Sequence, residues 1–326
     1  MKSKTAARSF LALTLCAASL AGGVLATADG GVLSVSIREN SAPVAQNIEC
    51  ATYRGIPVVG AFSASDPDGD GVTFTITSQP KYGSVEMSGT DAFTYTPSGR
   101  KSSDSFTYTA EDEHGAVSAP ATVTVTVKKR QTAVSYPDME GNPHYYAALR
   151  LAEEGIFTGK RLGTAYFFEP ESEVTRGEFL AMCMSVCGAD TLDGVSETGF
   201  FDDGDIPGWV KPYIASALQS GDISGYADEN GNAVFSSEAP VTFAEASVML
   251  DNLLDVTDAV GVSLSAPDNC PVWAYQAAAN LSSAGVLSFS DDYSAPLSRA
   301  QAAEMLSAAL DMLEARKSSG IFSWLE

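Results

Sequence analysis

Between residues 33 and 128, apolar and polar side chains alternate with a period of two. The pattern is clearest in four segments with threonine at most polar positions: 72–77, 93–96, 106–109 and 123–127. Clusters rich in Asp, Gly and Ser separate these segments, as is typical of turns. Period-two alternation indicates half-buried antiparallel strands. Short strands at regular spacing therefore predict a β-sandwich.

After residue 135 the spacing becomes helical, and one pattern occurs three times. Each unit opens near an aspartate, places an aromatic residue soon afterwards, and ends its first helix at a glycine, which is a common helix stop. The three sets are Asp138, Asp203 and Asp268; Tyr145, Trp209 and Trp273; and Gly155, Gly221 and Gly285. A repeat of this size predicts units that complete one another's hydrophobic cores.

The second helix of each unit begins with a capping box, in which a hydroxyl residue is followed three positions later by Glu or Gln. The pairs are Thr175 with Glu178, Thr242 with Glu245, and Ser298 with Gln301. Arg176 and Arg299 follow the hydroxyl in units one and three. A guanidinium at a helix start adds charge where anions are already favoured, and it binds carboxylates in a fork. We expect these arginines to hold an anion; the alternative is that they pair with neighbouring acids.

These features resemble the S-layer homology (SLH) domain, whose pattern is an aromatic-x-Asp opening, a Trp or Tyr-Tyr helix, a Gly-Ile step and a Thr-Arg-Ala-Glu motif. The resemblance covers about residues 135–314 and implies an all-α, pseudo-threefold SLH trimer with grooves between the units. It also implies binding of a secondary cell-wall polysaccharide, often pyruvylated. Three departures stand out: Phe243 replaces the arginine of unit two, Ala266 replaces the aromatic of unit three, and Gln301 replaces Glu.

The resemblance assigns roles to individual residues. Arg176 and Arg299 would hold the carboxylate of a pyruvate ketal. Trp209 and Trp273 would offer flat faces to a sugar ring, with burial in the core as the alternative. Asp138, Asp203 and Asp268 are weaker candidates, because such aspartates also serve only to cap or orient the chain.

The β-rich segment resembles cadherin-like, immunoglobulin-type modules of bacterial surface proteins. The matching motifs lie at 40–45, 65–70, 79–85, 93–97, 104–108 and 123–125. Such modules act as spacers or as adhesive units. The implied partner of an adhesive unit is a host or cell-surface ligand.

Asp66, Asp68 and Asp70 alternate in a glycine-containing turn and form the kind of oxygen cluster that Ca²⁺ accepts. An EF-hand is excluded, because Thr77 stands where its glutamate belongs. The resemblance adds Asp104 and Asp112 as further calcium ligands. The alternative is an ordinary turn with solvated carboxylates.

Residues 1–28 predict an export signal. Positive charges at Lys2, Lys4 and Arg8 precede an uncharged apolar run over 10–25, and 26–28 supply a small-x-small cleavage pattern. A bilayer span needs roughly 20 apolar residues. We therefore expect signal cleavage, no membrane span afterwards, and a secreted protein at the cell wall or S-layer.

The composition narrows the function. Asp and Glu number 41 against 19 Lys and Arg, a net charge of −22, which argues against nucleic-acid binding. No nucleophile elbow, HExxH or P-loop is present, so we expect no enzyme. Cys183 and Cys187 lie on one apolar helical stripe, which favours core packing over a metal or redox pair.

The sequence thus predicts a multidomain chain. Its expected parts are a signal peptide (1–28), a sandwich (33–128), a linker (129–134), SLH repeats (135–192, 198–257 and 264–314) and a tail (315–326). The expected function is non-covalent anchoring to the cell wall, with the sandwich as spacer or adhesive unit. The alternative is a calcium-dependent adhesin or glycan-binding module carried by the sandwich.

Overall fold

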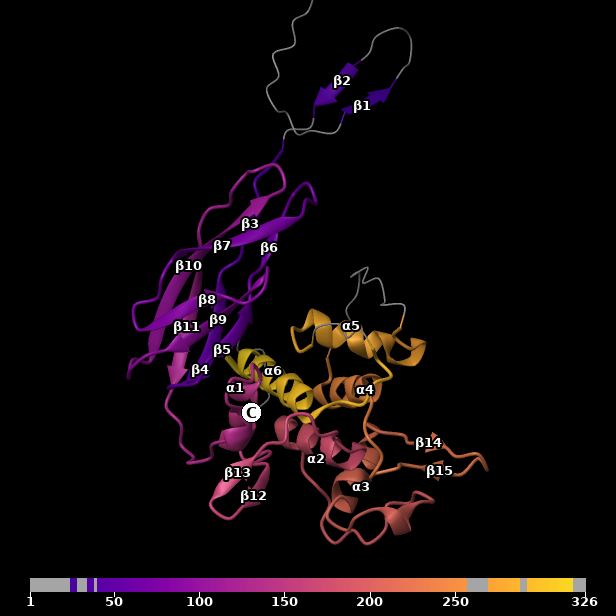
Figure 1. Ribbon diagram of the computed structural model, residues 1–326. Coiled ribbons are helices and arrows are strands. Elements are labelled where there is room, and N and C mark those ends of the chain that lie inside the picture. Colours follow the sequence, from indigo (N-terminus) through magenta and orange to yellow (C-terminus); the bar gives the residue numbers. More distant parts are fainter. Residues whose placement is uncertain (1–23, 28–33, 38–39, 257–268, 288–291, 319–326) are drawn as a thin grey trace, which may run out of the picture.

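The computed structural model describes residues 24–27, 34–37, 40–256, 269–287 and 292–318. A β-rich region is followed by a helical region (Figure 1). A hairpin of β1 (Val24–Thr27) and β2 (Ser34–Ile37) precedes both. The predicted export signal lies mostly outside the described residues.

Two larger sheets and one two-stranded sheet form the β-rich region. One has the strand order β4 (Ile48–Tyr53), β11 (Ala121–Lys128), β10 (Ser103–Asp112) and β7 (Val72–Ser78). The other has the order β5 (Val58–Ala61), β9 (Ala92–Pro97) and β8 (Gly83–Met87), and β3 (Val44–Ala45) pairs with β6 (Ala64–Ser65). Apolar side chains from both sheets share one core, among them Phe93, Tyr95, Phe106 and Val123.

The four predicted strands are confirmed as β7, β9, β10 and β11. In β11 the valines are buried while the threonines between them are exposed, as the alternation predicts. One pairing differs from the expected antiparallel order, because β11 runs parallel to β4. The antiparallel partner β10 occupies one edge of β11, so β4 pairs with the opposite edge.

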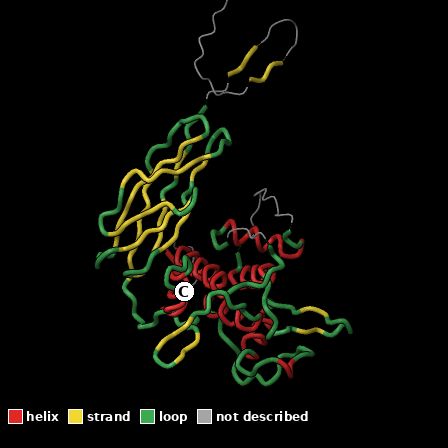
Figure 2. Tube along the Cα trace, viewed as in Figure 1, coloured by secondary structure: helices red, strands yellow, loops and turns green. Residues whose placement is uncertain are grey.

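The helical region follows the sandwich (Figure 2) and has six α-helices among its described residues. They are α1 (Tyr145–Glu153), α2 (Arg176–Cys187), α3 (Lys211–Ser220), α4 (Phe243–Leu254), α5 (Tyr275–Ser283) and α6 (Arg299–Ser318). Two hairpins, β12 (Lys160–Leu162) with β13 (Ala165–Phe167) and β14 (Tyr226–Ala227) with β15 (Ala233–Val234), were not predicted. Strands of two or three residues are too short to show a period.

The predicted capping boxes are confirmed. Thr175 Oγ1 accepts a hydrogen bond from Glu178 N, and Glu178 Oε2 accepts one from Thr175 N. The same reciprocal bonds join Thr242 to Glu245 and Ser298 to Gln301, with donor–acceptor distances of 2.9–3.3 Å. Cys183 of α2 is fully buried, so its predicted place in the core is also confirmed.

The starts of α2, α4 and α6 meet in a closed ring of backbone hydrogen bonds. Val174 N donates to Leu297 O (3.0 Å), Leu297 N to Val241 O (2.8 Å), and Val241 N to Val174 O (2.9 Å). All three side chains are buried in one core that extends through the helical region. The residues that precede the three capped helices therefore hold the helix starts together.

The sandwich packs against the helices. Tyr53 of β4 and Tyr146 of α1 place their ring centroids 5.4 Å apart. The segment 129–134, expected as a solvated linker, is bound to α1, because the Glu153 carboxylate accepts hydrogen bonds from Gln131 N and Thr132 N. This contact uses backbone amides of the segment, so its basic side chains could not predict it.

Candidate ligand-binding grooves

Arg176, the first residue of α2, lines a cavity of about 450 Å³ that we name the arginine groove. Residues 221–226, which follow α3, form one wall, and Glu245 and Met249 of α4 contribute another. Trp273 also lines the groove. The cavity thus joins parts of all three sequence units, as grooves between units require.

Four groups hold the Arg176 guanidinium in place. Its Nε donates to Phe235 O (2.9 Å), and Nη1 lies 2.8 Å from Glu245 Oε1. The rings of Tyr226 and Phe235 lie 5.3 and 5.0 Å from the guanidinium carbon. Arg176 is only 5% exposed, and within the described part of the chain no acceptor is paired with Nη2. Arg176 therefore pairs with a neighbouring acid, as one expectation had it. Its Nη2 donor is still available for an anion, so the other expectation is compatible with that pair.

Arg299, the first residue of α6, has a similar setting. Its Nη1 donates to Phe168 O (2.7 Å) and lies 3.1 Å from Glu169 Oε2. The Phe157 ring lies 5.2 Å from the guanidinium carbon. The two arginines thus share three features: an aromatic face, the carbonyl of a phenylalanine and a carboxylate.

Phe243, the first residue of α4, lines a cavity of about 780 Å³ that we name the phenylalanine groove. Its ring packs edge-on against Tyr293, with centroids 5.2 Å apart. His144, which precedes α1, residues at and after the end of α5, and Gln301 and Glu304 of α6 line the rest. The residue that interrupts the family motif therefore lies in a groove rather than in a filled core.

The two tryptophans lie on the surface. Trp209 is 56% exposed and Trp273 is 61% exposed, so the alternative of core burial is wrong for both. The Trp209 ring lies edge-on to Tyr213, with centroids 6.4 Å apart. Trp273 lies with Arg176 in the arginine groove, whereas Trp209 does not line that groove.

The aspartates that open the units bind backbone amides. Asp138 accepts hydrogen bonds from the amides of Phe168 and Glu169 (3.2 and 2.7 Å), and Phe168 O in turn accepts the Arg299 bond. Asp138 therefore positions a partner of Arg299. Asp268 lies outside the described residues.

In unit two the counterpart of Asp138 is Asp202 rather than the predicted Asp203. Asp202 accepts hydrogen bonds from the amides of Phe235 and Ser236 (3.0 and 2.7 Å), and Phe235 O accepts the Arg176 bond. Asp203 instead pairs with Lys211 Nζ (2.5 Å), which lowers the pKa of Asp203 to about 2. Spacing alone does not distinguish two adjacent aspartates, so the sequence pattern assigned the role to Asp203 and not to Asp202.

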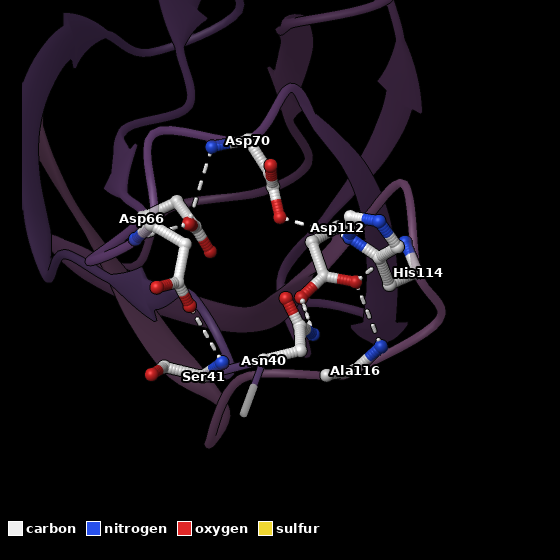
Figure 3. Close-up of polar contacts among 8 residues, drawn as sticks. Asn40, Ser41, Asp66, Asp70, Asp112, His114 and Ala116 are labelled. Atoms are coloured by element: carbon white, nitrogen blue, oxygen red, sulfur yellow. Dashed lines mark hydrogen bonds and ion pairs between the residues drawn. The ribbon is translucent and has the colours of Figure 1, made fainter. Parts of the chain in front are cut away.

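The candidate calcium residues gather in part at one end of the sandwich (Figure 3). Asp66 Oδ1 accepts hydrogen bonds from the amides of Asp68 and Asp70. Asp70 Oδ2 lies 2.9 Å from His114 Nδ1. Asp112 Oδ2 accepts from Asn40 Nδ2, and this bond is the main cause of a lowered Asp112 pKa.

Asp104 is not part of that cluster. It lies eight residues from Asp112 along β10, which is roughly 26 Å in a strand. Its carboxylate accepts hydrogen bonds from the amides of Lys81 and Tyr82 and from the Tyr95 hydroxyl. Among the described residues, no three His, Cys, Asp or Glu side chains form a group that could hold a metal ion.

Comparison with known families agrees with this division. Residues 40–129 match the family model of the bacterial cadherin-like domain, and residues 135–180 match that of the S-layer homology domain. The chain carries a bacterial cadherin-like domain followed by an SLH domain. Both are non-enzymatic domain types, and the SLH domain implies association with a cell wall or S-layer. Over the described residues, no helix is long and apolar enough to cross a membrane.

Solved structures share only part of this chain. An endo-fucoidan hydrolase of glycoside hydrolase family 107 is 17% identical over 31% of this chain and 18% of that one (TM-score 0.23). Fibronectin(III)-like modules of Clostridium thermocellum CbhA are 18% identical over 30% and 56% (TM-score 0.21). The SrpA adhesin of Streptococcus sanguinis is 13% identical over 31% and 68% (TM-score 0.22). No curated protein matches the chain.

Proposed function

We propose that this chain is an exported surface protein, held non-covalently on the cell wall by three SLH repeats that bind a secondary wall polysaccharide. The repeats span 135–192, 198–257 and 264–314, and residues 129–134 join them to the sandwich. The sandwich serves as a spacer or adhesive unit beyond the wall. The matched cadherin-like and SLH domains support this order.

Equivalent backbone contacts support the count of three repeats. In the ring of Val174, Val241 and Leu297, each residue donates one backbone hydrogen bond and accepts one. The next residues continue the pattern, because Arg176 N, Phe243 N and Arg299 N donate to Ala239 O, Ala295 O and Ser172 O. These shared contacts at the starts of the second helices support units two and three as repeats of the matched unit, although their side chains differ.

The arginine groove carries the proposal. A guanidinium offers five N–H donors and can bind carboxylates on two edges. Glu245 occupies one edge of Arg176, and Nη2 remains for the carboxylate of an acidic sugar. The exposed ring of Trp273 borders the same cavity and offers a flat apolar face to the sugar. Because aromatic rings stack against the guanidinium, its plane is fixed before the ligand arrives.

Sedimentation with wall fragments tests the proposal. The full chain is mixed with native sacculi and with sacculi chemically stripped of secondary polysaccharide. We expect the chain to sediment with the native sacculi and to remain in solution with the stripped ones. Equal retention on both would assign the binding to another wall component.

A second candidate is a calcium-dependent adhesive sandwich. The carboxylates of Asp66, Asp68 and Asp70 do not form a metal-binding group as they lie in the structure. One observation favours the candidate: Asp66 Oδ2 is buried and has no hydrogen-bond partner, in the same turn as Asp68 and Asp70. These loops lie at the end of the sandwich away from the helices, where a partner could reach them (Figure 1). Calcium should then raise the melting temperature of the sandwich, and Asp66→Asn should abolish that rise. A melting temperature unaffected by calcium and by chelator would contradict this candidate.

A further inference from the structure

The phenylalanine groove and the arginine groove are built from corresponding positions of different units. Both begin with the residue that follows a capping threonine, Phe243 or Arg176. The matched wall positions are Gln301 and Glu245, Met305 and Met249, Ala308 and Asn252, and Gly285 and Gly221. The two cavities are therefore lined by corresponding positions and differ in the side chains at those positions.

The side-chain differences remove an ion pair from the groove. In the arginine groove, Arg176 pairs with Glu245 at 2.8 Å. In the phenylalanine groove both members of that pair are replaced by neutral residues, Phe243 and Gln301. The replacement of one member alone would leave an unpaired charge in a partly buried site, which is unfavourable. Because both positions are neutral, neither leaves an unpaired charge in the phenylalanine groove.

The other lining groups also disfavour an anion. Among the described lining residues there is no arginine or lysine, and His144 Nδ1 is paired with Glu304 Oε2 at 2.6 Å. A ligand carboxylate would find Glu304 nearby and no free cation. Hydroxyl groups would find suitable partners, because carboxylate oxygens accept O–H bonds and amides both donate and accept.

Hydrogen-bonding capacity remains in this groove. Gln301 Oε1 accepts from Ser298 N, so the amide group still has its Nε2 donor, which no described residue engages. Phe243 contributes an aromatic ring, and Val286, Leu287 and Met305 contribute apolar surface. Apolar walls with a few polar groups are typical of small-ligand sites.

We propose that the phenylalanine groove binds a neutral sugar unit, a hexose or an N-acetylhexosamine, of the same polymer whose acidic units the arginine groove holds. This inference rests on the proposed function for the identity of the polymer. The Phe243 ring packs against the apolar face of the sugar, and Gln301 and Glu304 bond its hydroxyl groups. The two grooves thus read different units of one polysaccharide.

The two methionines provide a separate reporter for each groove. Met249 lines the arginine groove and Met305 the phenylalanine groove, and both are almost fully buried. The full chain is labelled with ¹³C-methyl methionine, and the two signals are assigned with Met249→Leu and Met305→Leu. Neutral probes are glucose, N-acetylglucosamine and N-acetylmannosamine; the acidic probe is glucuronic acid, each added to tens of millimolar.

We expect at least one neutral sugar to shift the Met305 methyl signal and to leave Met249 unchanged. Phe243→Arg should make that response several-fold weaker and let glucuronic acid shift Met305. Gln301→Glu, which keeps the capping box, should also weaken the neutral response. The signal of Met139, which is buried in the core and lines neither groove, verifies that each variant is folded.

Two results would overturn the inference: no neutral sugar shifts Met305, or glucuronic acid shifts Met305 in the unmodified chain. The Met249 signal reports on the arginine groove and does not enter either of these two results. If glucuronic acid and native sacculi fail to engage the chain while a neutral sugar still shifts Met305, the proposed acidic-polymer anchor fails and the neutral site stands.

Discussion

Arg176 Nη1 lies 2.8 Å from Glu245 Oε1, and this contact joins the first residue of α2 to the first turn of α4. Glu245 also accepts the Thr242 amide through Oε2, so one carboxylate caps its own helix and neutralises a buried arginine. Glu245→Gln keeps the cap, since Gln also completes a capping box. It should still lower the free energy of unfolding by about 2 kcal/mol, because a buried cation loses its counter-charge.

Glu178→Gln is the matched control for that variant. Glu178 makes the same capping contacts with Thr175, and no described arginine or lysine pairs with it. Its replacement should change the free energy of unfolding by less than about 0.5 kcal/mol. Equal losses for the two variants in urea unfolding would show that the Arg176 contact contributes nothing.

Arg150 ties α1 to α6 and is 1% exposed. It pairs with Asp311 Oδ1 (2.5 Å) and Glu314 Oε1 (3.0 Å) and donates to Ser307 O. Arg150→Ala leaves these acceptors without their cation and opens space in the core. Urea unfolding should show a loss of about 3 kcal/mol, against less than about 0.5 kcal/mol for the exposed Arg161→Ala. Similar losses would contradict the structural role of Arg150.

His144 and Glu304 predict a dependence of stability on pH. Their hydrogen bond is the main cause of a raised His144 pKa in the folded chain. A raised folded pKa gives stability that is fully present below the unfolded value of about 6.5 and is lost as pH rises through the folded pKa. The free energy of unfolding of the unmodified chain should therefore exceed that of His144→Gln at pH 5.5, and the difference should shrink toward pH 8.5. A difference that is constant over this range would refute the contact.

Asp202 and Asp203 should respond differently to substitution. Asp202→Asn weakens the hold on Phe235 and Ser236, so it should reduce retention on native sacculi through the Arg176 partner. Asp203→Asn should affect stability instead. The folded pKa of Asp203 is lowered to about 2, so its contribution is present above the unfolded value of 3.8 and is lost as pH falls through about 2. The reverse assignment, with Asp203→Asn abolishing retention, would restore the sequence-based choice.

Much of the architecture could be predicted from local patterns. The threonine alternation located β11, and the hydroxyl-to-glutamate spacing located the start of α2, because both signals arise within one element. The parallel pairing of β4 with β11 could not be predicted, since it depends on which sheet edge is left vacant by long-range contacts. The bond from Gln131 to Glu153 was missed for the same reason.

The grooves were predictable only in part. Arg176 and Arg299 stood out because a cation at a helix start is chemically unusual. Their partners, such as Phe235 O, are backbone atoms that no side-chain motif reveals. The expected calcium set was too large, because Asp104 and Asp112 are close in sequence but lie at opposite ends of one strand.

The most direct measurement compares Arg176→Gln/Arg299→Gln with Arg161→Gln/Arg100→Gln in binding to native sacculi, with circular dichroism to verify folding. Both double variants lose the same charge, but Arg161 and Arg100 are exposed. Loss of charge-assisted bonds in the grooves should raise the apparent Kd of the first variant about tenfold or more, while the second binds like the unmodified chain. A folded Arg176→Gln/Arg299→Gln chain with unchanged Kd would contradict anchoring through these arginines.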